Sequence, residues 1–203
     1  MQVELKTIGF KEVERILGDM HKKAPSVLFN VINRVTSNIR KNLSKKVLKR
    51  YGIKSAEVKK TVKTKRASKS NPSAYVSSSG EALPLIKFKV KPTDVISQKL
   101  IKIKDRKSVK GKVLKSQKLK VIRHAFVQKM PSGHIGVFRR KLISENLKKM
   151  AGNSAIKKTI HELHGPSVPQ MVANEEVMKR ILTEATETYN KRLEHEIKRI
   201  LGK

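Results

Sequence analysis

Apolar residues recur every three to four positions in the N-terminal part of the chain. FKEVERILGDM (residues 10–20) has this spacing and predicts a short amphipathic helix. A longer helix is predicted from Pro25, because proline suits the first helical turn, to a stop at Gly52. SAEVKKTV (residues 55–62) predicts two further turns with Ser55 as the N-cap. The apolar face of the longer helix consists of Leu28, Val31, Ile32, Val35, Ile39, Leu43 and Val47.

The last stretch, residues 174–203, predicts a second long helix. Asn174 is a suitable N-cap, glutamates follow it in the first turn, and two basic residues precede a stop at Gly202. Charges of the favourable sign therefore lie at both ends of the helix dipole. The apolar stripe is consistent with packing on a sheet or on another subunit. It consists of Met178, Leu182, Ala185, Tyr189, Leu193, Ile197 and Ile200.

Outside these helices the apolar period changes to two, which predicts strands. VELKTI (3–8), IKIK (101–104) and KLKVIR (118–123) alternate in this way. AFVQKMPSGHIGVFRR (125–140) predicts a β-hairpin that turns at Pro131-Ser132-Gly133. PLIKFKVKP has apolar residues on one side and basic residues on the other, namely Ile86, Phe88 and Val90 against Lys87, Lys89 and Lys91.

Two stretches show neither period. Residues 63–84 contain Asn-Pro and a serine run, which predicts a loop. Residues 104–118 have almost nothing to bury, which predicts a mobile loop or arm. The whole pattern predicts an α+β fold, in which a small, mostly antiparallel sheet packs with a long helix in the N-terminal half and a long C-terminal helix. We expect one domain over residues 1–203, with a basic loop or arm at about 92–118.

The charge of the chain is extreme. Its 203 residues include 48 Lys and Arg against 16 Asp and Glu, a formal net charge of +32. Self-repulsion at this level destabilises a compact chain, so a polyanionic partner is expected, and nucleic acid is the first candidate. The absence of cysteine excludes disulfides and thiolate metal sites. No apolar run is long enough to predict a membrane span, and the N-terminus lacks an apolar signal core.

Positive charge is concentrated in the middle of the chain. Residues 40–66 contain twelve Lys and Arg against Glu57 alone, whereas the C-terminal helix is nearly neutral. One-sided charge of this kind is typical of a surface that faces phosphates, although lysine on edge strands also protects a sheet from aggregation. We expect electrostatic, salt-sensitive binding without base specificity, because aromatic residues make up only 4% of the chain. The candidate phosphate contacts are Arg40, Lys41, Lys45, Lys46, Lys49, Arg50, Lys59, Lys60, Lys63, Lys65, Arg66, Lys87, Lys89 and Lys91.

No constellation of residues predicts catalysis. His161 and His164 are three residues apart, but Gly165 and Pro166 disfavour the helix that would make them a ligand pair. Ser167 lacks the Gly-x-Ser-x-Gly elbow of a nucleophile. The aspartates are few and scattered, so a two-metal nuclease centre has few candidate ligands. We therefore expect no enzyme activity, no cofactor and no metal site.

HGPSVPQM (residues 164–171) is accordingly interpreted as architecture. Pro166 and Pro169 fix φ and restrict the residues before them, which predicts a stiff, extended connector that leads straight to the cap of the last helix. Such a connector orients a helix or offers a fixed edge to a neighbour. The candidate assembly surface combines the hairpin turn with this connector and consists of Pro131, Gly133, Gly136, Gly165, Pro166, Ser167, Val168, Pro169, Gln170 and Met171.

The C-terminal run HELHGPSVPQMVANEEVMKRILTEATETYNKRLEHEIKRIL, with GPSVPQM and RLEHEI inside it, closely resembles the prophage minor tail protein Z family. This family comprises lambda-type tail-completion proteins of long-tailed phages. Upstream, YGIKSAEVKKTVKTKRAS, LPLIKFKVKP and RHAFVQKMPSGHIGVFRR are similar to the family's middle section, in the same order. The opening strand and two helices also resemble neck and tail-completion proteins. Residues 92–118 and 140–158 depart from the family because they are Lys-rich and longer than expected between its strands.

The resemblance implies a structural virion protein that completes the tail at its head-proximal end, in the tail or neck of the virion, after assembly in the host cytoplasm. It implies a ring with the sixfold symmetry of the tail, so a hexamer is expected. Its implied neighbours are the tail terminator, the tail tube or sheath and neck proteins. Double-stranded DNA in the neck is a further candidate partner, which fits the Lys-faced strands. The DNA expectation fails if these faces point away from the channel axis.

Other interpretations predict different behaviour. A cellular nucleic-acid-binding protein, for instance one bound to ribosomal RNA, accounts for the charge equally well but predicts monomeric binding without ring assembly. A nuclease requires clustered carboxylates and predicts that mutation of Glu145 or Glu162 abolishes cleavage. A headless contractile bacteriocin is a variant of the tail interpretation in which no DNA is packaged, and the sequence does not separate it from an intact phage.

Overall fold

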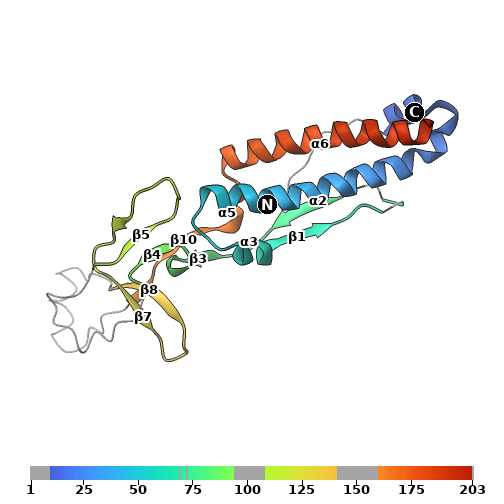
Figure 1. Cartoon of the computed structure of the whole chain (residues 1–203). Helices are drawn as coiled ribbons and strands as arrows, with labels where there is room; N and C mark the ends of the chain where they lie inside the picture. The colour runs from blue at the N-terminus through green and yellow to red at the C-terminus, as the bar shows by residue number, and fades with distance from the viewer. Residues whose placement is uncertain (1–9, 69, 72, 94–107, 141–159, 203) are drawn as a thin grey trace, which may run out of the picture. The chain divides into compact units, whose positions relative to one another are not determined.

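The computed structural model of the chain describes residues 10–68, 70–71, 73–93, 108–140 and 160–202 (Figure 1). The strands expected at residues 3–8 and 101–104 lie outside this part of the chain. The single domain expected from the sequence stays a prediction. The chain divides into two compact units, which we call the helical unit (Met1–Lys49, Ser55–Glu81 and Ser167–Lys203) and the strand unit (Arg50–Lys54 and Ala82–Pro166).

The helical unit begins with α1 (Phe10–Leu17), a 3-10 helix η1 (Gly18–Lys23) and the long α2 (Ala24–Arg50). Both predicted helices are confirmed, but the first ends early because Gly18 has a left-handed φ of 52°. Met20, the last apolar residue of the helix predicted over residues 10–20, therefore lies in η1 and is 40% exposed, so the predicted apolar face does not extend to it. The predicted face of α2 is confirmed except at Ile32, which is only half-buried; the buried members are Leu28, Val31, Val35, Ile39, Leu43 and Val47.

The second long helix, α6 (Glu175–Leu201), lies antiparallel to α2 (Figure 1). Asn30 Nδ2 donates a hydrogen bond to Glu196 Oε2 at 3.3 Å, which joins the start of α2 to the end of α6. Lys46 pairs with Glu184 further along. Each helix contains 27 residues and is therefore about 40 Å long. The two helices form the frame of the helical unit.

The buried stripe of α6 is a row of residues four apart: Val177, Ile181, Ala185, Tyr189 and Leu193. The predicted stripe is confirmed from Ala185 to Leu193, whereas Ile197 and Ile200, predicted beyond it, are only half-buried. Met178 and Leu182, which were also predicted in it, are only half-buried. Consecutive residues of a helix are about 100° apart, so these two side chains flank the buried row.

Both ends of α6 agree with the prediction. Asn174 is the N-cap residue, although its side chain makes no capping hydrogen bond. Two glutamates lie in the first turn and two basic residues in the last turn. Gly202 is the C-cap with a left-handed φ of 72°, and its N–H donates to Lys198 O. Glycine adopts this conformation without a steric penalty from Cβ, so the helix ends there.

α3 (Ser55–Thr61) confirms the two turns predicted there, although Ser55 is its first helical residue and not a separate N-cap, and Val62 already belongs to a strand. A hairpin missed by the sequence pattern follows α3. β1 (Val62–Lys65) pairs antiparallel with β2 (Tyr75–Ser78), so the loop predicted over residues 63–84 is wrong for these strands. Their inner face has few apolar side chains, which leaves a weak period of two. It consists of Val62, Thr64, Val76 and Ser78, which pair across the strands.

A side chain of α2 fixes the end of this hairpin. The Asn33 amide donates to Ala67 O at 3.2 Å and accepts from Ala67 N at 3.0 Å. This two-way bond mimics a strand partner for the first residues after β1, and Ala67 itself is buried. The hairpin is thereby tied to the long helix by a polar as well as an apolar contact.

The Pro-rich connector is not extended throughout, which corrects the sequence-based prediction. His164–Ser167 form the strand β10, but Val168–Val172 form a short helix, α5. Pro169 is accommodated because proline is tolerated in the first turn of a helix, where its missing N–H is not needed. α5 contacts α3, β2 and α6 within the helical unit, and α6 starts only after it.

The strand unit contains small sheets. β3 (Ala82–Pro84) pairs with β10, and a 3-10 helix, η2 (Leu85–Lys87), follows. β4 (Lys89–Lys91), β5 (Lys110–Lys112) and β6 (Lys120–Val121) pair antiparallel in that order and form a three-stranded sheet. The alternation predicted for PLIKFKVKP is confirmed from Phe88 to Lys91, where Phe88 and Val90 are buried and Lys89 and Lys91 are exposed. It is wrong for Leu85–Lys87, which form η2 with Leu85 buried and Ile86 half-buried.

Two details of this sheet differ from the prediction. Residues 110–112 are a strand and Val109 is only 2% exposed, so this part of the predicted mobile loop is ordered structure. Val121 is 54% exposed, so the apolar side predicted for KLKVIR does not face the core at this position. Backbone hydrogen bonds between strands account for both differences, because they can hold a segment in a sheet even when it has little apolar surface to bury.

The predicted hairpin at residues 125–140 is confirmed. β7 (Ala125–Lys129) pairs with β8 (Ile135–Arg140), and β9 (Ile160–Glu162) adds to the other edge of β8. Gly133 has a φ of 84° in the turn, as predicted for a glycine there. The structure as a whole confirms the α+β class, with two long helices and small antiparallel sheets of two or three strands.

Candidate phosphate-binding and assembly surfaces

A row of like charges lies along the C-terminal half of α2. Lys41, Lys45 and Lys49 are four residues apart and all are exposed, so their side chains share one ridge of the helix. Like charges at this spacing destabilise a helix by about 0.2–0.5 kcal/mol per pair. No carboxylate of the described residues pairs with them. Arg40, on the same helix, is also exposed.

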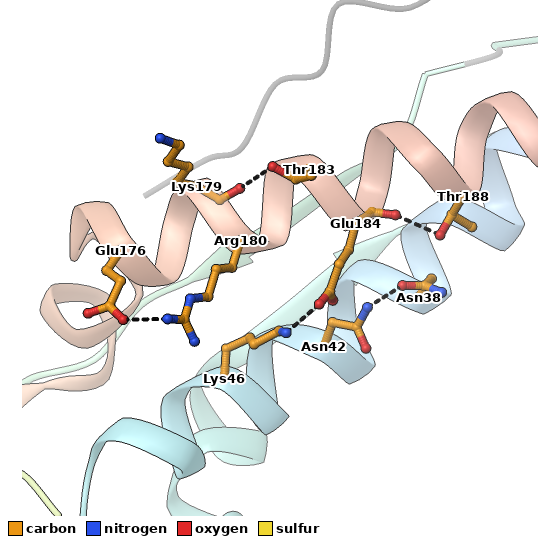
Figure 2. A network of polar contacts seen from close by, with 9 residues as sticks. All are labelled: Asn38, Asn42, Lys46, Glu176, Lys179, Arg180, Thr183, Glu184 and Thr188. Atoms are coloured by element: carbon orange, nitrogen blue, oxygen red, sulfur yellow. Dashed lines mark hydrogen bonds and ion pairs between the residues drawn. The ribbon is translucent and has the colours of Figure 1, made fainter. Parts of the chain in front are cut away.

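Lys46 differs from the row beside it, because it contacts Glu184 of α6 (Figure 2). The carbonyl oxygen of Glu184 also accepts a hydrogen bond from Thr188 Oγ1 at 2.7 Å. On the same helix Arg180 pairs with Glu176 at 2.7 Å, while the ammonium group of Lys179 points away from α2 (Figure 2). The charge of Lys46 is thus partly neutralised inside the molecule.

Further basic side chains lie on α3 and on the outer face of β1. Lys63 and Lys65 alternate with the inner residues of β1, and both are exposed. Lys65 Nζ lies 5.9 Å from the centre of the Tyr75 ring on β2, a cation–π arrangement. The remaining sequence-predicted contacts of this region, Lys59, Lys60 and Arg66, are exposed, whereas Arg50 is half-buried.

The strand unit brings lysines together that the sequence pattern did not connect. Lys89 and Lys91 of β4 lie directly opposite Lys112 and Lys110 of β5. Lys110 and Lys112 were missed because residues 104–118 were predicted to be a loop. The only sequence signal for a strand at Lys110–Lys112 was the alternation of Lys, Gly and Lys. Lys87, the remaining predicted contact, lies in η2 and is exposed.

The hairpin residues proposed for assembly lie in different surroundings. Pro131 and Gly133 are exposed at the turn, which Gly133 N closes by donating to Met130 O at 2.9 Å. Gly136 is buried in β8 below Glu162, and a Cβ there would lie 3.0 Å from the Phe138 ring. The turn therefore offers surface to a partner, whereas Gly136 makes room for its own sheet.

Most of the GPSVPQM residues serve the interior of the chain. A Cβ at Gly165 would lie 2.5 Å from the Phe88 ring, so only glycine fits there. Ser167 and Gln170 form a capping box, in which Ser167 N donates to Gln170 Oε1 at 2.9 Å and Gln170 N donates to Ser167 Oγ at 3.3 Å. Ser167, Val168 and Met171 are buried, Pro166 and Pro169 are half-buried, and Gln170 alone of the seven is exposed.

A histidine-rich cluster lies over β8 and β9. His134 Nε2 lies 2.8 Å from Glu162 Oε1, and His164 Nδ1 lies 3.1 Å from the carbonyl oxygen of Glu162. Within the described ranges, no group of three His, Asp or Glu side chains has the arrangement of a metal site. Glu145, the other carboxylate considered for a nuclease, lies outside the described residues. None of the described helices is long and apolar enough to span a membrane.

The chain matches one known family over nearly its whole length. The family model described as prophage minor tail protein Z (GPZ) matches residues 8–203. No match is found among curated proteins or among solved structures. The chain therefore belongs to the prophage minor tail protein Z family, and the resemblance seen in GPSVPQM and RLEHEI is confirmed.

Proposed function

We propose that this member of the prophage minor tail protein Z family completes the head-proximal end of a phage or phage-like tail, as a ring subunit near the DNA channel of the tail–neck junction. Family membership supports a structural role in a phage tail, contact with other tail components and a place in the virion. The observation that carries the finer proposal is the uneven distribution of positive charge.

That distribution separates two kinds of surface within the helical unit. α6 contains as many acidic as basic residues and pairs several of them, whereas the basic row of α2 and the outer face of β1 have no acidic neighbour among the described ion pairs. A ring multiplies the charge of +32 per chain by the number of subunits. Such an assembly needs a polyanion close by, and the DNA that passes through a neck supplies one.

The proposed neighbours follow from this position. A hexamer matches the sixfold symmetry of a tail, and the tail terminator, the tail tube or sheath and the neck proteins lie within reach of a ring at this place. The exposed turn at Pro131 and Gly133 and the exposed Gln170 are the parts of the proposed assembly surface that are accessible to such neighbours. The proposed role is structural, without catalysis and without a cofactor.

Mass photometry of the purified full-length chain, in low and high salt and with or without double-stranded DNA, tests the proposal. A discrete ring, either spontaneous or induced by DNA or by tail tubes, is the expected result. A monomer that coats DNA or RNA in proportion to its length contradicts the ring and favours a general nucleic-acid-binding protein. Addition of purified tail tubes then separates assembly from simple charge-driven binding, because only assembly gives a fixed stoichiometry.

A further inference from the structure

We infer that the four lysines shared by β4 and β5 bind the phosphate backbone of duplex DNA. This lysine block consists of Lys89, Lys91, Lys110 and Lys112. The inference rests on the proposed contact of the chain with DNA and assigns that contact to a site in the strand unit. Two of the four residues, Lys110 and Lys112, come from a segment in which no binding residue was expected.

The pairing of the two strands sets the geometry of the block. Lys89 lies opposite Lys112, and Lys91 lies opposite Lys110, in an antiparallel register. Directly opposed side chains have their Cβ atoms about 5 Å apart, and residues two apart on a strand are about 7 Å apart. All four ammonium groups therefore emerge from one small area on one face of the sheet. Val121 of β6, which pairs with Lys110, adjoins them on that face.

Folding the chain brings these charges together against their mutual repulsion. Like charges placed directly opposite one another destabilise an antiparallel pair. The block contains two such pairs, and no carboxylate among the described residues neutralises them. A bound anion stabilises such a sheet, because its negative charge offsets the repulsion between the lysines. Closely spaced phosphates provide such an anion.

The opposite face of the sheet holds the block in place. Val90 and Val109 are 4% and 2% exposed, and Ile122 N donates to Val109 O at 2.8 Å. A Cβ on Gly111 would lie 3.0 Å from Ile122 Cδ1 and 3.7 Å from Val90 Cγ2, so the strands pack closely on this side. The lysines thus project from a fixed platform with an apolar underside.

One of the four ammonium groups is positioned before any ligand binds. Lys112 Nζ donates to Lys115 O at 2.8 Å and to Gln117 O at 2.9 Å. An ammonium group has three donors, so one remains for an external acceptor. Because two donors are held by the turn that follows β5, the third has a restricted direction. The other three lysines are exposed.

The composition of the face favours DNA over an acidic protein. Protein interfaces are enriched in aromatic residues, Met and Arg at their centres and depleted in Lys. The lysine block itself contains no aromatic or Arg side chain, and Val121, which pairs with Lys110, adjoins it on that face. Lysine acts as a hydrated point charge that suits phosphates without reading bases. A sequence-independent contact to a phosphodiester backbone requires no more than this.

The test compares double variants of the full-length chain that remove the same charge from two places. Lys91→Gln/Lys110→Gln removes one opposed pair and leaves the turn contacts of Lys112 intact. Lys179→Gln/Lys191→Gln removes two exposed charges from α6 and is the matched control. Affinity for a mixed-sequence duplex of about 30 bp is measured by fluorescence anisotropy as a function of salt. A third variant, Lys91→Arg/Lys110→Arg, keeps the charge.

We expect the first variant to bind the duplex roughly ten- to a hundredfold more weakly near 0.1 M salt, with a salt slope about two units smaller, since each phosphate contact contributes about 0.9 to that slope. The control and the Arg variant should bind as the unsubstituted chain does. The melting temperature of the first variant should equal or exceed that of the unsubstituted chain, because repulsion between opposed lysines is relieved.

Three results overturn the inference. If the first variant binds DNA as tightly as the control does, the block is not the site, although the proposed DNA contact stands. Poly-L-glutamate, titrated in the same way, stands in for an acidic protein. If the first variant keeps its affinity for the duplex but loses affinity for poly-L-glutamate, an acidic protein is the partner of this face. If the unsubstituted chain itself binds no duplex, the proposed DNA contact fails and the inference fails with it.

Discussion

α6 and the lysine block show opposite uses of charged side chains. Along α6 six glutamates and six basic residues alternate, and Glu176–Arg180 and Glu194–Lys198 pair at 2.7 and 2.6 Å within the helix. The lysine block places four positive charges on two short strands with no acidic residue between them. Charges in α6 support the fold of their own chain. Those of the lysine block oppose it, and our inference that they bind an external anion rests on this difference.

The largest expected change in stability concerns the buried, apolar side of α6. Ile181 is 1% exposed, so Ile181→Ala should lower the free energy of unfolding by about 2–5 kcal/mol through lost burial and a cavity. Urea unfolding followed by circular dichroism measures this, with Thr183→Ala on the exposed side as the control. Similar effects of the two variants would show that the stripe is not part of the core. A loss of unfolding free energy that depends on protein concentration would assign the stripe to a subunit interface.

A smaller effect is expected at the start of α5. Ser167→Ala removes the side-chain oxygen that accepts from Gln170 N and should cost about 1 kcal/mol. Ser132→Ala, in the exposed hairpin turn, is the matched control and should have little effect. Thermal unfolding compares the two variants. Equal melting temperatures for both would mean that the capping box contributes nothing to the fold, contrary to its geometry.

A lysine-to-glutamate substitution should have opposite effects on stability in the lysine block and in α6. Lys110→Glu places a carboxylate opposite Lys91 and should stabilise the chain by about 0.2–1 kcal/mol while weakening its binding to DNA. Lys191→Glu places a carboxylate four residues after Glu187 and should destabilise α6 by about 0.2–0.5 kcal/mol. Urea unfolding of both variants should therefore give opposite signs. The same sign in both would remove the distinction between the regions.

The smallest effect is the pH dependence of one exposed pair in α6. The hydrogen bond and charge of Lys198 hold the pKa of Glu194 below its ordinary value of 4.5. Because the pKa is lower in the folded chain than in the unfolded chain, this pair stabilises the fold above pH 4.5, and that contribution is lost as the pH falls through the lowered pKa. NMR titration of the Glu194 carboxyl should show its pKa rising in Lys198→Gln. An unchanged pKa would mean that the pair does not persist in solution.

The helices and the hairpin at residues 125–140 were predictable because their signals are local. Apolar spacing with a proline near the start defines α2, and apolar spacing between an Asn cap and a terminal glycine defines α6, all within the segments themselves. The β1–β2 hairpin and α5 were missed for the converse reason. β1 has only Val62 as an apolar inward residue, and the first four of the five α5 residues belong to the Pro-rich stretch that was predicted to be extended.

The sequence by itself determined the family, the α+β class, the two long helices and the excess of positive charge, because each depends on composition or on neighbours along the chain. Tertiary structure alone decided which charges meet. Lys46 pairs with Glu184 of α6, which is far from it in the sequence, whereas Lys91 lies opposite Lys110. Both outcomes depend on contacts between residues far apart in the sequence. Strand register and helix packing set those contacts, and no local pattern records them.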